Sequence, residues 1–266
     1  MPDDIQTFPG RFRGPAKFYT GGRPDYPPRL LARVATLVGG LERGRVLDLG
    51  TGPGFLALGF APHAAEVIGI DPEPAMLAEA ERNAAAAGRR IVWRAGTAET
   101  LDPALAPVRL VTIGRAFHWM DRSATLARLD LVVEAGGAVA LFDTLQPNLI
   151  ANAWHAAFNA VVERYGAADP ARGHLAAASD HDAVLLASAF RHIERISVLE
   201  QRHTPVERLV DRAYSFAKTW GGQLDTPPQG LAEDVRAALR PYAVDGHVSE
   251  ILEGHATLAW RPDELG

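Results

Sequence analysis

The stretch Val46-Leu47-Asp48-Leu49-Gly50-Thr51-Gly52-Pro53-Gly54, together with Val67-Ile68-Gly69-Ile70-Asp71 further along, decides the fold of this chain. The first part is an apolar run that ends in a glycine-rich turn, which is typical of a strand that turns sharply into a helix. The second part is another apolar run, and it ends in a carboxylate. We therefore expect a strand–turn–helix–strand unit with a ligand site at the carboxyl ends of both strands.

The spacing within this unit indicates which ligand the turn accepts. Gly50, Gly52 and Gly54 allow the backbone to approach a ligand closely, and Asp71, which follows Gly50 by 21 residues, can accept both hydroxyls of a ribose. A dinucleotide site usually reads G-x-G-x-x-G, but here the third glycine comes one residue early and Phe55 takes its position. The turn is therefore not expected to hold a pyrophosphate. The structural alternative is that the glycines only punctuate a turn and that Asp71 caps the next helix.

The pattern D-x-G-x-G-x-G, which begins at Asp48, resembles the class I S-adenosylmethionine-dependent methyltransferases. The resemblance implies an α/β fold with a seven-stranded, mostly parallel Rossmann-like sheet in the order 3-2-1-4-5-7-6. It implies S-adenosyl-L-methionine as the cofactor, with contacts from Thr51 as well as the three glycines. Asp48 lies at the strand end, where it can orient the ammonium group of the cofactor or the amides of the turn.

Asp71-Pro72-Glu73-Pro74-Ala75-Met76-Leu77 resembles the family's ribose-binding segment. There the acid binds the ribose and a following apolar side chain covers the adenine. The resemblance implies cofactor contacts from Asp71, Pro72 and Met76.

Gly96-Thr97-Ala98-Glu99 is similar to the family's loop that lies against the adenine edge. Many relatives carry an acid where this chain has Thr97. The contact to the adenine amino group therefore stays open between Thr97, Glu99 and the backbone of Ala98.

Gly114-Arg115-Ala116-Phe117-His118-Trp119-Met120-Asp121 resembles small-molecule methyltransferases of the trans-aconitate and ubiquinone-pathway type. The resemblance places methyl transfer at this segment, with His118 and Trp119 beside the substrate. Its other implied cofactor contacts are Arg115, Ala116 and Phe117. Enzymes that methylate nucleobase amines or protein glutamine carry an Asn/Asp-Pro-Pro-aromatic tetrad here, and its absence argues against both substrate classes.

The N-terminal stretch Phe8–Pro28 is rich in aromatic residues, glycine and proline. It is too irregular to predict a helix or strand and too aromatic for a disordered tail, so we expect it to cover the cofactor. Its portion Tyr19–Pro27 resembles the segment that closes the pocket in the same subgroup. The resemblance implies that Arg23 meets the methionine carboxylate and that Tyr19 binds nearby.

His118 has two interpretations. An imidazole at this position can act as a general base for the acceptor, which typically contributes a factor of about 10²–10⁴, or it can serve only as a wall. Trp119 is either packing or a cation–π partner of the sulfonium. We also expect Trp154, Tyr214 and Trp220 to contact the substrate, although aromatic residues with helical spacing are as often core.

Composition narrows the function. The chain has 266 residues, a formal net charge of −5 and no cysteine, and its basic residues are scattered, so nucleic acid is not an expected partner. It shows no apolar run of membrane length, so we expect a cytoplasmic enzyme for a small-molecule substrate. A homodimer stays open. His174, His181 and Asp182 have no metal-ligand spacing, and Asp143 lacks a neighbouring Asp-Asn pair, so we expect no metal.

The element pattern alternates strands and helices up to residue 143. The expected strands are 45–49, 66–70, 91–94, 110–114, 138–142, 192–201 and 247–260. The expected helices are 28–39, 55–61, 74–87, 123–131, 152–165, 182–190, 206–219 and 231–242. We expect one methyltransferase domain over 1–266, with 1–28 as the cofactor-covering segment and 149–190 as a substrate lid inserted after the fifth strand.

The expected function is methyl transfer from S-adenosylmethionine to a small metabolite, with oxygen favoured as the acceptor atom and carbon or nitrogen open. An NAD(P)-dependent oxidoreductase also needs a glycine turn and an acid such as Asp71, but the early third glycine disfavours it. A non-catalytic descendant that only binds the cofactor is the other alternative.

Overall fold

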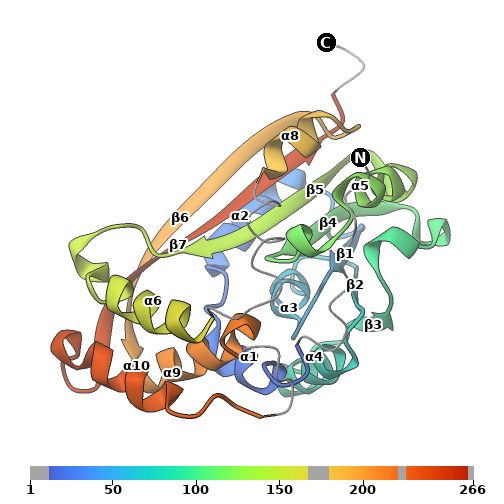
Figure 1. The fold of residues 1–266 in the computed structure, drawn as a ribbon. Coiled ribbons are helices and arrows are strands. Elements are labelled where there is room, and N and C mark those ends of the chain that lie inside the picture. Colours follow the sequence, from blue (N-terminus) through green and yellow to red (C-terminus); the bar gives the residue numbers. More distant parts are fainter. Residues whose placement is uncertain (1–11, 167–179, 221–225, 263–266) are drawn as a thin grey trace.

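A computed structural model describes residues 12–166, 180–220 and 226–262 (Figure 1). Its centre is a seven-stranded sheet in the order β3-β2-β1-β4-β5-β7-β6, which confirms the expected α/β fold and strand order. The strands are β1 (Arg45–Leu49), β2 (Glu66–Asp71), β3 (Val92–Ala95), β4 (Val108–Gly114), β5 (Val133–Leu145), β6 (His192–Pro205) and β7 (His247–Trp260).

The strand directions place the glycine turn and the acid at one edge of the sheet. β1 pairs in parallel with β2 and β4, and β4 pairs in parallel with β5. Consequently Leu49, Asp71 and Gly114 all end strands at the same edge, where ligands bind in open α/β sheets. β7 runs antiparallel between β5 and β6, so it returns past this edge.

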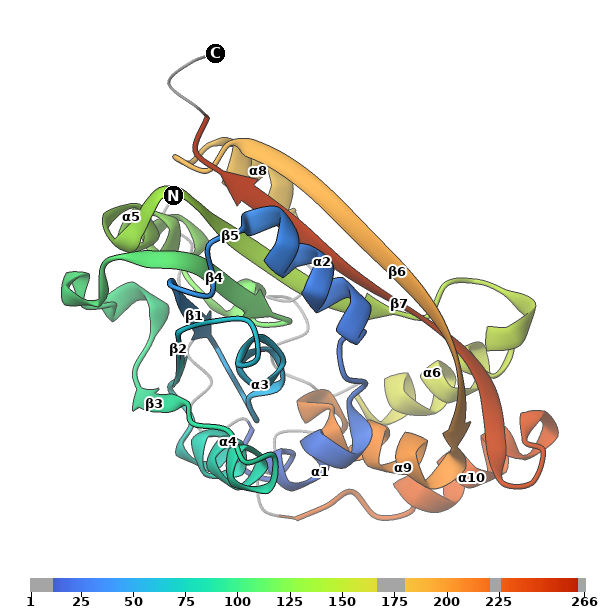
Figure 2. The same cartoon turned by 180° about the vertical axis from the view of Figure 1, so that it is seen from behind.

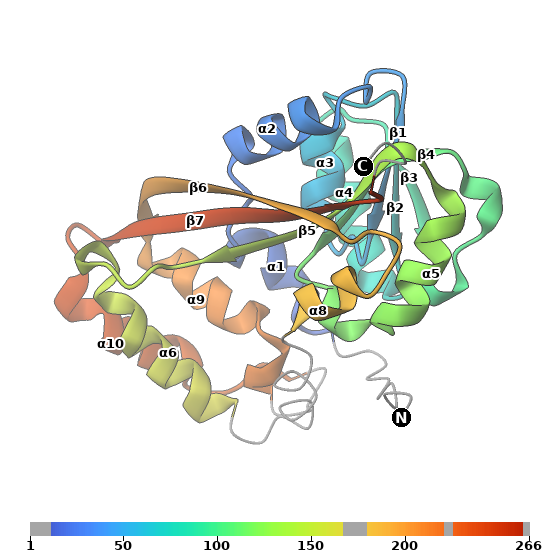
Figure 3. The ribbon, with the colours of Figure 1, turned by 90° about the horizontal axis from the view of Figure 1, so that it is seen from above.

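Helices cover both faces of the sheet (Figures 2 and 3). The α-helices are α1 (Ala16–Gly22), α2 (Pro28–Val38), α3 (Phe55–Phe60), α4 (Pro74–Ala86), α5 (Arg122–Val132), α6 (Trp154–Tyr165), α8 (His181–Leu186), α9 (Val206–Ser215) and α10 (Leu231–Leu239). No helix in the described ranges is both long enough and apolar enough to span a membrane.

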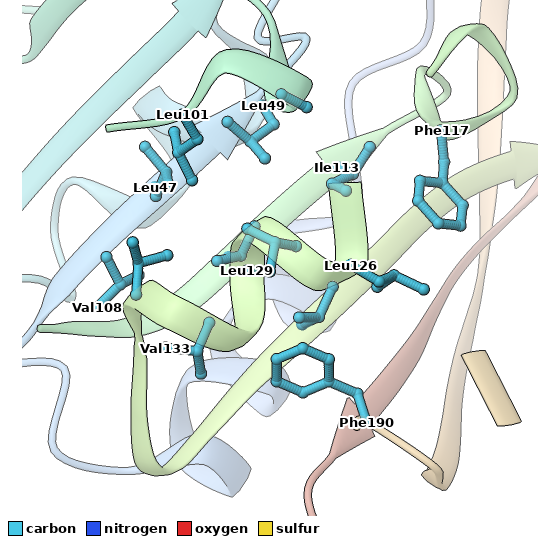
Figure 4. Packing of buried hydrophobic residues seen from close by; sticks show 14 of the residues in the cluster. Leu47, Leu49, Leu101, Val108, Ile113, Phe117, Leu126, Leu129, Val133 and Phe190 are labelled. Carbon is cyan, nitrogen blue, oxygen red and sulfur yellow. The ribbon is translucent and has the colours of Figure 1, made fainter. Parts of the chain in front are cut away.

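Two hydrophobic cores flank the sheet. On one face, α2 and α3 pack on the strands through buried side chains such as Leu30 and Phe60. On the other face, Leu126 and Leu129 of α5 pack against strand residues and against Phe190 (Figure 4). Burial of these apolar surfaces holds the parallel strands in register, and it leaves their carboxyl ends free for a site.

The N-terminal segment corrects one expectation. Residues expected to be irregular form helix α1, Ala16–Gly22. Its end packs closely on α9, because a Cβ added at Gly22 would lie 2.4 Å from the backbone nitrogen of Arg212. Tertiary contact therefore stabilises a helix that its own short, glycine-ended sequence does not predict.

Several strands are longer than the sequence predicts, and β5 and β6 extend the furthest. β5 continues past residue 142 to Leu145, and β6 continues past residue 201 to Pro205. Both extensions pair with β7, in which Glu253 lies opposite Leu145 and His247 lies opposite Pro205. Backbone hydrogen bonds to β7 stabilise these extensions as strand, although their mixture of polar and apolar residues does not predict one.

The expected lid, 149–190, does not form one continuous element in the described residues. Helix α6 packs with α9 and α10 in a third hydrophobic cluster, whereas α8 packs on α5 and β6 (Figure 3). Residues 167–179 lie outside the described residues. The covering role of this segment stays a prediction.

A buried ion pair joins helix α9 to strand β7 of the sheet. The Arg212 guanidinium of α9 donates to both carboxylate oxygens of Glu250 on β7 and also to the carbonyl of Gly22. Thr204 and Gln146 donate to the same carboxylate. Although burial opposes ionisation, these partners hold the pKa of Glu250 below its ordinary value. The network ties α1 and α9 to the long strand β7.

Candidate active site

The glycine turn opens onto free space at one position. Gly50, Gly52 and Gly54 have φ values of 60°, 53° and 86°. A Cβ on Gly50 would lie 2.6 Å from the Ala116 Cβ, so that glycine permits close packing of the turn on the segment after β4. A Cβ on Gly52 would meet nothing within 4 Å. Gly52 therefore leaves room at the turn for a ligand.

Asp48 lies beneath the turn. Its carboxylate accepts hydrogen bonds from the hydroxyls of Thr51 and Thr112 and from the amide of Ala57 at 3.3 Å. Burial raises the pKa of Asp48 to about 6, against the effect of these donors. Asp48 was expected to orient either the ammonium group of the cofactor or the turn itself. Its contacts in the described residues stabilise the turn, and Thr51 takes part in them.

Asp71 ends β2 directly beside the turn. It is 7% exposed, and its two oxygens accept the amides of Gly52 and Glu73, each at 2.8 Å. Burial raises the pKa of Asp71 to about 6 while these amides oppose the rise. Each carboxylate oxygen keeps a further lone pair, so the group can also accept two ribose hydroxyls. This geometry fits the ribose of an adenosyl cofactor.

The residues expected around the adenine lie at the neighbouring strand ends. Met76 is buried in the first turn of α4, and Pro72 before it is exposed. Ala98 is buried in a 3₁₀ turn, Ala98–Thr100, after β3. Thr97 is exposed and its hydroxyl is 3.1 Å from that of Thr100.

Glu99 has a structural contact that bears on the adenine contact. One of its carboxylate oxygens accepts the Asp121 amide at 2.9 Å. Asp121 in turn caps α5 by accepting the Ala124 amide at 2.9 Å. Glu99 therefore braces the loop after β4, and it keeps one oxygen for other partners.

Arg23, directly after α1, is a half-buried cation next to Tyr19. Its guanidinium lies over the rings of Tyr19, at 5.1 Å, and Phe216, at 4.1 Å. Its Nε is buried without a hydrogen-bond partner in the described residues, and burial lowers the pKa of Arg23 to about 10. Tyr19 reaches Phe55, the first residue of α3, with ring centroids 6.4 Å apart. An anion such as the carboxylate of a methionine tail fits beside this guanidinium.

Helix α1 is pinned to the turn by a chain of side chains. Thr20 donates to Glu79 of α4 at 2.9 Å. Asn83 donates to Thr20 at 3.1 Å and to the Pro53 carbonyl at 3.0 Å. The N-terminal segment is therefore held beside the glycine turn, as its expected covering role requires.

A cavity of about 460 Å³ lies at the carboxyl ends of β4 and β5. Arg115, Ala116, Phe117 and His118 form one wall. The expected cofactor contacts of Arg115, Ala116 and Phe117, and the expected role of His118 beside the substrate, stay predictions. Arg115 has a positive φ of 53°, and its guanidinium donates to the Pro24 carbonyl and the Thr144 hydroxyl, each at 3.2 Å. Since Ala116 also touches the turn at Gly50, the cavity adjoins the expected methyl-donor position.

Sequence reasoning missed other residues that line this cavity. They come from α8, β6 and β7 and include His181, Arg195, Glu253 and His255, together with Asp143 at the end of β5. Burial lowers the pKa of His181, whose Nδ1 has no hydrogen-bond partner in the described residues. No sequence motif predicts that these residues lie together, because strand pairing brings them from distant parts of the chain.

Trp154, Tyr214 and Trp220, which were expected to contact the substrate, are not in the lining of this cavity, and their contact with the substrate stays a prediction. Trp154 and Trp220 are 1% and 4% exposed, and their indole groups donate to the carbonyls of Ser249 and Tyr214, respectively. Tyr214 stacks on Phe18 with ring centroids 4.8 Å apart. Trp154 and Tyr214 belong to the third hydrophobic cluster, and the Trp220 ring lies beside Phe18, with ring centroids 6.2 Å apart.

Trp119 also lies outside the lining of the cavity. Its ring meets Phe12 edge-on at 5.9 Å and lies 5.0 Å from the His118 ring. The Trp119 ring is therefore a neighbour of His118, and its expected place beside the substrate stays a prediction.

No group of three or more metal-ligating side chains occurs in the described ranges. His181 and Asp182 begin α8, and Asp182 pairs with Arg195. His174 lies outside the described residues.

Comparison with known proteins agrees with this geometry. A family profile described as a methyltransferase domain matches residues 46–137. An uncharacterized methyltransferase of Mycobacterium tuberculosis is 29% identical over 194 residues, which cover 73% of this chain and 71% of the relative. A ubiquinone biosynthesis O-methyltransferase of Alkalilimnicola ehrlichii is 35% identical over 126 residues, covering 47% of this chain and 51% of the relative.

Solved structures share the fold. The YcgJ protein from Bacillus subtilis superposes with a TM-score of 0.51 at 18% identity, covering 88% of this chain and 99% of that one. A protein of Anaeromyxobacter dehalogenans gives a TM-score of 0.57 at 21% identity, covering 90% and 97%. The methyltransferase-domain profile and the methyltransferase relatives, together with the glycine turn, the buried Asp71 and an Arg23 Nε that has no hydrogen-bond partner in the described residues, support a class I S-adenosylmethionine-dependent methyltransferase with S-adenosylmethionine as its cofactor.

Proposed function

We propose that this enzyme transfers a methyl group to an oxygen atom of a small metabolite, which binds in the cavity at the ends of β4 and β5. The observation that carries the proposal is the position of that cavity. Its wall, Arg115–His118, also packs on the glycine turn at Gly50, so the acceptor and the methyl donor share a boundary. A volume of about 460 Å³ lies in the range of sites that bind small molecules.

The protein contributes mainly position. S-adenosylmethionine supplies an electrophilic methyl group on a sulfonium. Asp71 and Arg23 bind the two ends of the cofactor and fix its orientation. The cavity then aligns the acceptor for in-line displacement, and such alignment can lower a barrier by up to about 7–11 kcal/mol.

Oxygen is the favoured acceptor atom because His118 lines the cavity. A hydroxyl loses its proton as the methyl group arrives, and an imidazole at the cavity wall can take that proton. The match to ubiquinone biosynthesis O-methyltransferases supports the same choice. The cytoplasmic location, the absence of a nucleic-acid partner and the open homodimer stay predictions from the sequence.

The activity is tested with methyl-labelled S-adenosylmethionine and a pool of bacterial metabolites. We expect labelled product, identified by mass spectrometry as a methyl ether or ester. Cofactor binding without any labelled product would instead indicate a non-catalytic descendant. Quenching of NADH fluorescence on binding, with no affinity for S-adenosylhomocysteine, would indicate the oxidoreductase alternative.

Replacement of His118 by Asn separates the two interpretations of this residue. If the imidazole is the base, kcat falls by about 10²-fold or more and the acidic limb of the pH–rate profile disappears. The matched variant His203→Asn, on an exposed part of β6 outside the cavity lining, should keep the wild-type profile. An unchanged kcat with a raised KM would show that His118 is only a wall.

Cofactor affinity should fall as the pH is lowered. The raised pKa of Asp71, about 6, means that its carboxylate takes up a proton in mildly acidic solution, and the neutral acid is a poorer acceptor for the ribose hydroxyls. We expect the Kd of S-adenosylhomocysteine to be constant above about pH 7 and to rise by up to about tenfold per unit below 6. The measurement is calorimetric titration across this range.

The variant Asp71→Asn is the control for this titration, because its amide does not titrate. It should bind weakly and lose most of the pH dependence, with Asp48 supplying any remainder. A wild-type Kd that does not change with pH would contradict the assignment. The raised pKa also makes the unliganded fold less stable as the pH rises from about 4 to 6, because the unfolded chain releases this proton first.

A further inference from the structure

The cavity has a second polar wall that the proposed methyl transfer does not use. Asp143 on β5, His255 on β7 and Ser197 on β6 occupy one row of the sheet, since His255 lies opposite both Asp143 and Ser197. All three line the cavity. The opposite sheet face is apolar, with Ala256 in the core beneath α2. A polar row on the cavity side of a sheet that is apolar behind it indicates a wall shaped for a polar ligand.

Asp143 and His255 are close neighbours without a contact to each other. Side chains directly opposite in antiparallel strands have Cβ atoms about 4.5–5.5 Å apart. Within the described residues, however, the carboxylate and the imidazole form neither a hydrogen bond nor an ion pair. Asp143 accepts only the amide of Thr144, at 2.7 Å on one oxygen. A polar group between the two side chains would satisfy both.

Several of the surrounding polar groups already have partners. Arg195 pairs with Asp182 of α8, and Ser197 donates to Glu253 at 2.6 Å. The Arg115 guanidinium is directed to Pro24 and Thr144. Two buried nitrogens of the cavity, Nε of Arg115 and Nδ1 of His181, have no hydrogen-bond partner in the described residues. On the sheet side, the free capacity is the second carboxylate oxygen of Asp143 and the ring nitrogens of His255. A carboxylate only accepts hydrogen bonds, so the group that fits here must donate them.

The row is also set apart from the methyl-transfer position. Neighbouring strands lie about 4.8 Å apart, and β5 and β7 follow β4 in the sheet. The turn and His118 stand at the β1 and β4 end of the cavity, so the row on β5, β7 and β6 faces the other end of a bound acceptor. His255 lies on a strand that pairs with neighbours on both sides, so the backbone position from which its ring extends is fixed.

We propose that Asp143 and His255 form a recognition subsite for a second functional group of the acceptor, a hydroxyl or a protonated amine, distant from the oxygen that is methylated. The acceptor is then a small molecule with at least two polar groups, and repulsion from the carboxylate of Asp143 disfavours a carboxylate directly beside it. The inference rests on the proposed function, because it places the acceptor in the same cavity.

The first experiment defines the acceptor class. A bacterial metabolite extract is divided by ion exchange into cationic, neutral and anionic fractions, and each is incubated with the enzyme and methyl-labelled S-adenosylmethionine. We expect label in the cationic fraction if the second group is an amine and in the neutral fraction if it is a hydroxyl. Label only in the anionic fraction would overturn the subsite and leave the proposed function standing. Label in no fraction would overturn both.

The second experiment tests the two side chains with the acceptor so obtained. Asp143→Asn and His255→Gln should each raise its KM by about tenfold or more, because a charge-assisted or imidazole hydrogen bond is lost, while kcat changes less. The affinity for S-adenosylhomocysteine should not change. The matched variants Asp245→Asn and His203→Gln, both outside the cavity lining, should behave as wild type.

A readout independent of turnover completes the test. With S-adenosylhomocysteine bound, addition of the active fraction should shift the imidazole NMR resonance that is absent from His255→Gln. An unchanged resonance, or KM values equal to wild type in both cavity variants, would show that this row does not bind the acceptor.

Discussion

Replacement of Gly52 by Val should abolish cofactor binding while the protein still folds. The valine side chain would occupy the space beside the turn in which nothing lies within 4 Å, and that is where the ligand must approach. It would also strain a backbone with φ of 53°, a region that β-branched residues rarely adopt. We expect the affinity for S-adenosylhomocysteine to fall by about a thousandfold or more, beyond detection by calorimetry. The reason is that the ligand could no longer approach the backbone of the turn at Gly52.

Gly88 offers a closely matched control. It follows α4, has a φ of 62°, and likewise has nothing within 4 Å of an added Cβ. Gly88→Val therefore introduces a comparable backbone strain away from the site. It should lower the melting temperature to a similar extent and bind the cofactor normally. Normal binding by the Gly52→Val protein would show that the glycine turn is not the cofactor site.

Replacement of Asp71 by Ala should weaken cofactor binding by about 2–4 kcal/mol, or about 30- to 1,000-fold. Two hydrogen bonds from ribose hydroxyls to a buried carboxylate are lost, and water replaces them only in part. The amides of Gly52 and Glu73 also lose their acceptor, so the turn itself becomes less ordered. Calorimetric titration with S-adenosylhomocysteine measures the effect.

The neighbouring Glu73→Ala serves as the matched control. It removes a carboxylate two residues away and leaves the amide that donates to Asp71 in place. Its affinity should stay within about twofold of wild type, as expected of a side chain that makes no hydrogen bond to the ligand. Equal affinities for the Asp71 and Glu73 variants would remove Asp71 from the cofactor site.

Local sequence pattern predicted the elements whose cause is local. β1 occupies Arg45–Leu49 and β7 occupies His247–Trp260, as expected, because each is bounded by turn residues that also punctuate the sequence. Helix α1 and the extensions of β5 and β6 were not predicted. Their stability comes from partners distant in the chain, namely α9 for the helix and β7 for both strands.

The candidate site divides in the same way. The turn and Asp71 were predicted because binding of the ligand requires glycines and an acid at a set spacing within one short segment, and that spacing is visible in the sequence. The positions of Trp154 and Trp220 could not be predicted, because the sequence pattern of an aromatic residue on a helix is the same whether the residue packs in a core or lines a cavity. In the structure both are buried, Trp154 in the third hydrophobic cluster and Trp220 beside Phe18.

By itself, the sequence determined the fold class, the cofactor turn and the carboxylate beside it, because those features depend on residues that are neighbours along the chain. Only the tertiary structure decided what surrounds the acceptor cavity. Asp143 and His255 are separated by more than a hundred residues, and they face each other because β7 returns antiparallel beside β5 in one particular register. A shift of one residue would turn His255 to the opposite face, so long-range pairing, and not local pattern, sets this wall of the site.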